Sequence, residues 1–184
     1  MPDKNSDTQW PRFMVFQQAA KGDPLLHNGT VHAPDAEMAL LNARDVFARR
    51  PDGVAFWVVP AGEIYTQTRE ELAKSETGLT PDRSTNRLID YYVFGKFDQQ
   101  GQCRQVGDVN ASSAHAAVLA AIKKYPEQAP LWWWVFPKDV VLRSEERDRG
   151  PMFAAARDKS YKDQAEYPVV TLMRELRAKV NKDK

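Results

Sequence analysis

The sequence predicts an α+β protein: two tandem β-β-α-β repeats packed as a pseudo-twofold dimer, followed by a C-terminal tail that ends in a helix. The segment Gly29–Pro60 has the pattern of a strand end, an amphipathic helix and an apolar strand. A diverged copy of it returns at Gly107–Pro137, and each copy follows a β-hairpin pattern. A polar stretch rich in Thr, Glu and Ser separates the two copies.

The domain boundaries are expected at these changes of composition. The first repeat covers residues 10–66, a linker covers 67–87, the second repeat covers 88–142, and the tail with its helix covers 143–184. A unit of about 50 residues buries too little surface to be stable alone. We therefore expect each sheet to bury its free apolar face against the other repeat. Chain order predicts that the first strand lies between the second and third strands, with the helix on one face.

The first repeat is expected to contain three strands and one helix. Aromatic and β-branched residues predict strands at Arg12–Gln18 and Leu26–His32, and Gly29 within the second strand indicates a bulge or a close approach of another segment. A helix begins near Asp35, and an apolar strand follows it at Val54–Val59. The helix is expected to bury one face, formed by Ala36, Ala39, Leu40, Ala43, Val46 and Phe47.

The second repeat follows the same order of elements. Strands are expected at Leu88–Phe97 and Cys103–Val109, a helix at Ser112–Tyr125, and a last strand at Leu131–Phe136. The copies align with an offset of 78 residues through the helix and 77 after it. The identities fall on predicted core and turn positions, so the two copies share a scaffold and differ in surface.

Composition argues against several classes of partner. Lys plus Arg number 26 against 25 Asp plus Glu, a net charge of +1, which is too small to attract nucleic acid or an anionic membrane. The single cysteine, Cys103, forms no intrachain disulfide and is typical of a reducing compartment. No apolar run approaches the roughly 20 residues that cross a bilayer. We expect a soluble, cytoplasmic protein.

The residues that most often carry chemistry are few. His27, His32 and His115 lack the spacing of a metal site, and Cys103 has no histidine beside it in sequence. The run Trp132–Trp134 has no interleaved basic residues, which favours core and interface over a base-stacking surface. We expect no catalytic, cofactor-binding or metal-binding residue in this chain, and no enzymatic activity of the isolated chain.

The outer face of the first helix is the best candidate for function. Exposed apolar residues among charged ones are typical of a partner interface. A solvated helix face is the alternative interpretation of the same pattern. The candidate interface residues on this face are Met38, Leu41, Asn42, Arg44, Asp45 and Arg49.

The stretch HAPDAEMALLNARDVFARR, followed by WVVP and an acidic turn, resembles the phenylacetate-degradation protein B family, the B subunit of ring-1,2-phenylacetyl-CoA epoxidase. The resemblance is dense from Trp10 to Ile64. The tail SEERDRGPMFAAARDKSY at Ser144–Tyr161, with Tyr167 after it, is similar to the tail of that family. Typical members contain one repeat, so this chain looks like a fusion of two such proteins.

The resemblance implies a non-catalytic accessory or bridging subunit of a multicomponent di-iron monooxygenase that epoxidises phenylacetyl-CoA in aerobic phenylacetate catabolism. It implies A (catalytic, di-iron) and C (structural) subunits as partners, and possibly a reductase with flavin and iron–sulfur centres. It adds Lys159, Tyr161 and Tyr167 of the tail as candidate contacts. The alternative is a stand-alone small-molecule binder or enzyme, similar to dimeric α/β-barrel proteins, that uses an aromatic cleft between the repeats.

Overall fold

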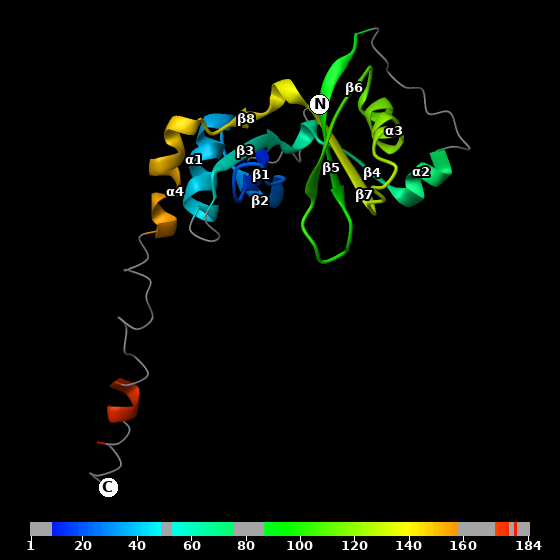
Figure 1. Ribbon diagram of the computed structural model, residues 1–184. Coiled ribbons are helices and arrows are strands. Elements are labelled where there is room, and N and C mark those ends of the chain that lie inside the picture. Colours follow the sequence, from blue (N-terminus) through cyan, green and yellow to red (C-terminus); the bar gives the residue numbers. More distant parts are fainter. Residues whose placement is uncertain (1–8, 49–52, 76–86, 158–171, 177–178, 180–184) are drawn as a thin grey trace, which may run out of the picture.

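The computed structural model describes residues 9–48, 53–75, 87–157, 172–176 and 179. The first half of the chain forms β1 (Arg12–Gln18), β2 (Leu26–His32), α1 (Ala36–Phe47), β3 (Ala55–Pro60), η1 (Ala61–Glu63), β4 (Tyr65–Thr68) and α2 (Arg69–Ser75). The second half forms β5 (Ile89–Lys96), β6 (Arg104–Ala111), α3 (Ala114–Lys124), β7 (Trp132–Pro137), η2 (Lys138–Val140), β8 (Leu142–Arg143), η3 (Glu146–Asp148) and α4 (Arg149–Arg157). Residues 172–176 of the tail are also helical. The α+β class predicted from the sequence is confirmed (Figure 1).

The described strands form one eight-stranded sheet in the order β4-β7-β5-β6-β2-β1-β3-β8, and all neighbouring pairs are antiparallel. The first strand of each repeat lies between the second and the third, as the sequence predicts. The repeats join where β2 meets β6. There the His27 N–H donates to the Cys103 carbonyl and the Gln105 N–H donates to the Leu25 carbonyl, each at 2.8 Å.

The short strand that follows each β-β-α-β unit pairs with the other repeat. After β3 and η1 the chain crosses over, and β4 pairs with β7 of the second repeat. After β7 and η2 it crosses back, and β8 pairs with β3 of the first repeat. The helices continue this exchange, because Leu72 of α2 packs in the core of the second repeat while Met152 and Phe153 of α4 pack in the core of the first. Residues 67–75 of the expected linker thus belong to β4 and α2.

Three apolar cores hold the described residues together. One lies between α1 and the first repeat's strands, and a second lies between α3 and the second repeat's strands. The third lies between the two repeats, on the strand faces that do not contact α1 or α3. Phe16, Phe94 and Phe136 are fully buried there. The ring centroids of Phe16 and Phe94 are 4.5 Å apart. This contact buries the face of each repeat's strands that its own helix leaves free, and it accounts for the pseudo-twofold packing of the repeats.

A glycine at a β-bulge recurs in both repeats. The β1–β2 register shifts beside Gly29, and the β5–β6 register shifts beside Gly107. Gly29 has φ +150°, and a Cβ there would lie 2.9 Å from the Phe47 ring. At Gly107 the close neighbour is the ring of Tyr125, the counterpart of Phe47. Gly29 is therefore both a bulge and a close-approach site, as predicted.

The predicted buried face of α1 is wrong at one position. Val46 is 60% exposed. In the last turn of the helix, Phe47 points toward the core. Its ring packs directly over Gly29, which has no side chain to block it. In β7, Trp133 is buried on the side of α3 and Trp134 packs in the core between the repeats, so the two rings lie on opposite faces of the strand.

Candidate partner interface

Helix α1 is fixed at one end by a cap and along one side by alanines. The Asp35 side chain caps it by accepting a hydrogen bond of 2.8 Å from the Met38 N–H. Ala39 and Ala43 are fully buried, and their small side chains let the helix lie close to the sheet. The opposite face points outward, where Met38 is 41% and Leu41 43% exposed.

The segment from β8 to α4 lies beside this helix, although about 100 residues separate them in the sequence (Figure 1). Ser144 extends the pairing with β3: its N–H donates to the Phe56 carbonyl and its hydroxyl accepts from the Phe56 N–H, both at 2.9 Å. The ring of Phe153 stacks on that of Phe56 with centroids 4.9 Å apart. The strand exchange thus brings the tail that follows the second repeat onto the first repeat.

A groove of about 440 Å³ runs between α1 and this segment. Its apolar part combines side chains of α1 with side chains of β8 and α4. Carboxylates and guanidinium groups lie among them. The lining residues are Glu37, Leu40, Leu41, Arg44, Leu142, Arg143, Glu145, Asp148, Pro151 and Met152.

Both guanidinium groups of the groove are engaged elsewhere on the molecule. Arg44 forms an ion pair with Asp45 at 2.9 Å. The Arg143 guanidinium lies 4.4 Å from the centroid of the Trp57 ring and donates a hydrogen bond to the Tyr92 hydroxyl. The carboxylates of the groove thus lie beside two guanidinium groups whose own partners are Asp45, Trp57 and Tyr92.

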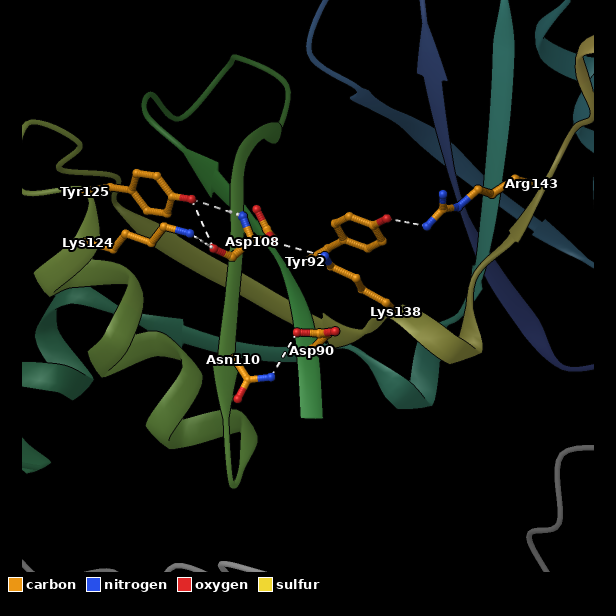
Figure 2. A network of polar contacts seen from close by, with 8 residues as sticks. All are labelled: Asp90, Tyr92, Asp108, Asn110, Lys124, Tyr125, Lys138 and Arg143. Carbon is orange, nitrogen blue, oxygen red and sulfur yellow. Dashed lines mark hydrogen bonds and ion pairs between the residues drawn. The ribbon is translucent and has the colours of Figure 1, made fainter. Parts of the chain in front are cut away.

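Arg143 donates to the Tyr92 hydroxyl, and the Lys138 ammonium lies 5.0 Å from the centroid of the Tyr92 ring, so Tyr92 connects the groove to the polar contacts of the second repeat (Figure 2). The Lys138 ammonium donates to the Asp108 carboxylate at 3.0 Å. This contact lowers the pKa of Asp108 and raises the pKa of Lys138. Lys138 belongs to η2, the turn that crosses back to the first repeat, so the network anchors the chain just before β8.

The structure brings together only some of the predicted interface residues. Leu41 and Arg44 line the groove. Met38 and Asp45 are exposed on the neighbouring side of α1. The Asn42 side chain donates to the His32 carbonyl at 3.0 Å, a contact that ties α1 to β2. Four further predicted residues lie outside the described residues: Arg49, Lys159, Tyr161 and Tyr167.

Sequence reasoning misses the groove residues that come from the tail. The available signal is the motif SEERDRGPM, which resembles the family's tail but carries no indication of its place in the fold. Only the pairing of β8 with β3 puts this motif beside α1. Glu37 is also absent from the predicted set, because in the sequence it stands out only as a position at which the two repeats differ.

Cys103 and His27 are occupied in packing. Burial raises the pKa of the Cys103 thiol to about 12. Burial likewise lowers the pKa of His27, whose ring packs against Phe16 and Trp134. No group of three or more His, Cys, Asp or Glu side chains is arranged to hold a metal ion among the residues described here. None of the described helices is long and apolar enough to cross a membrane.

Comparison with known proteins identifies relatives of this chain. It is similar to the B subunit of 1,2-phenylacetyl-CoA epoxidase from Escherichia coli (strain K12), with 44% identity over 66 residues. These residues are 36% of this chain and 70% of the relative, which is therefore about half as long. No solved structure matches the chain.

A family model covers both halves of the sequence. The model described as "Phenylacetic acid degradation B" matches residues 9–81 and then residues 87–174. The two matched segments correspond to the two repeats, and the second includes the tail that lines the groove. On this match, which takes in most of the sequence, the chain belongs to the phenylacetic acid degradation B family.

Proposed function

We propose that this chain is a non-catalytic accessory subunit of a multicomponent di-iron monooxygenase that epoxidises phenylacetyl-CoA in phenylacetate degradation. It bridges assemblies of the catalytic A and structural C subunits, and the di-iron, flavin and iron–sulfur centres belong to the partner subunits. The observation that carries the proposal is the outward groove between α1 and the β8–α4 segment. The two stretches of sequence that most resemble the family meet at this groove.

The packing between the repeats also favours this function over a stand-alone binder or enzyme. That alternative needs an open aromatic cleft. The rings of Phe16, Phe94 and Phe136 are instead fully buried against one another and form a core. The one thiol of the chain is held protonated by burial, which argues against a nucleophilic role for Cys103.

Co-expression with the A and C subunits, followed by size-exclusion chromatography, tests the proposal. We expect the three chains to elute as one complex. Elution of this chain alone, while A and C remain together, would contradict the bridging role. In parallel, a thermal-shift assay of the isolated chain with phenylacetyl-CoA is expected to show no stabilisation, and a strong upward shift would favour the small-molecule binder instead.

A further inference from the structure

We propose that the groove between α1 and the β8–α4 segment takes a protein segment of an oxygenase subunit, one that carries apolar side chains flanked by lysine or arginine. This inference rests on the proposed function, since it names the chemistry by which such a partner is recognised. The groove combines an apolar floor with carboxylates at its rim. That combination fits an amphipathic segment with a basic edge.

The floor of the groove exposes apolar side chains that a partner can bury. Leu41 is 43% exposed, and Leu40 and Leu142 are partly exposed beside it. The tail contributes Pro151, which is exposed, and Met152, whose inner side is fixed in the core. Because Met152 and Leu142 are anchored by packing and by strand pairing, the groove is formed before a partner arrives, which lowers the entropic cost of binding.

The carboxylates of the groove favour a positively charged partner segment. Glu37, Glu145 and Asp148 line it. Glu145 and Asp148 pair with Arg147 at 2.7 and 3.9 Å, and the Arg147 side chain is 78% exposed, so both pairs are screened by solvent. Glu37 is exposed and pairs with no cation among the described residues. An incoming Lys or Arg finds carboxylates there, whereas an incoming Asp or Glu is repelled.

The corresponding position on the second repeat lacks this chemistry. By the 78-residue offset, Glu37 and Arg44 of α1 correspond to His115 and Ile122 of α3. His115 contacts Gln67 of the donated strand β4 at 3.3 Å. Leu119 corresponds to Leu41 and is 42% exposed, nearly the same fraction. The two leucines are therefore almost equally exposed, and they differ in the residues that surround them.

The first experiment compares Leu41→Glu with Leu119→Glu in the full chain. Binding to a purified A–C assembly is measured by biolayer interferometry, and thermal melting checks that each variant folds. We expect Leu41→Glu to weaken binding by about tenfold or more and Leu119→Glu by less than about twofold. Equal losses, or no loss in Leu41→Glu, overturn the proposal. Failure of the unaltered chain to bind overturns the proposed function as well, which separates the two failures.

The second experiment tests the basic edge of the partner. The double variant Glu37→Lys/Asp148→Lys is expected to bind about tenfold more weakly and to lose part of the salt dependence of binding. A photo-crosslinking residue at position 41 then identifies the bound segment by mass spectrometry. We expect a peptide of the A or C subunit with apolar residues and a flanking Lys or Arg. Unchanged or tighter binding of the double variant, or a crosslinked peptide without basic residues, overturns the proposal.

Discussion

At the scale of single residues, each repeat packs an aromatic ring against the glycine of its β-bulge. Phe47 lies over Gly29, and Tyr125 lies over Gly107. The hydroxyl of Tyr125 also accepts from the Asp108 N–H at 3.1 Å and donates to the Asp108 carbonyl at 3.0 Å. The second repeat therefore keeps the packing of the first and adds hydrogen bonds at its bulge.

Gly29→Ala is expected to lower the free energy of unfolding by at least about 2 kcal/mol, because its φ is unfavourable for alanine and the new Cβ would meet the Phe47 ring. Gly62→Ala is the matched control, since a Cβ there meets no atom within 4 Å. Urea denaturation of both variants measures the difference. Similar midpoints for the two variants would contradict the close approach at Gly29.

His27 gives the stability a pH dependence. Its burial favours the neutral ring, so its pKa in the folded state is below the value of about 6.5 expected when unfolded. Lys96 nearby also disfavours protonation. Its contribution is fully present above pH 6.5 and is lost as the pH falls through the folded-state pKa. His27→Gln places the residue type of its counterpart, Gln105, at this position.

We expect the free energy of unfolding to fall less steeply between pH 7 and pH 5 in His27→Gln than in the unaltered chain. Denaturant titrations at a series of pH values measure both curves. The difference between the curves isolates His27 from the carboxylates that titrate in the same range. Parallel curves would show that His27 titrates alike in the folded and unfolded states.

At the scale of elements, strong local patterns were predictable and short exchanged strands were not. The predicted bounds of β1 and β2 match those observed. Helix α1 starts directly after Asp35, near its predicted start, and the N-cap of α3, Ser113, lies within the predicted range Ser112–Tyr125. Strands β4 and β8 have four and two residues and show too little alternation to recognise. Their pairing depends on the other repeat, so the sequence does not predict that six of the ten groove-lining residues come from the β8–α4 segment.

Phe153 of α4 is expected to be the main anchor of the tail. It is 1% exposed and stacks on Phe56 of the first repeat. Phe153→Ala should therefore cost about 3–5 kcal/mol of stability. Ala154→Ser, at an exposed neighbouring position, is the control and should change the stability by less than about 0.5 kcal/mol. A cost near that of the control would mean that α4 is not held in the core.

At the scale of the whole molecule, the exchanged strands make the two repeats one unit. The first repeat is completed by β8 and α4, and the second by β4 and α2. This exchange explains why a tail that follows the second copy in sequence supports α1 of the first. Differential scanning calorimetry is expected to show one transition with equal calorimetric and van't Hoff enthalpies. Two separable transitions would contradict a shared core.

We propose that this chain supports oxygenation by partner subunits and performs no chemistry itself. Reconstitution of phenylacetyl-CoA epoxidation from the A, C and reductase subunits, with and without this chain, tests it most directly. We predict NADPH-dependent product formation only when this chain is added to the other subunits, and none from the chain alone. Epoxidation by the isolated chain, or full activity of the other subunits without it, would contradict the account.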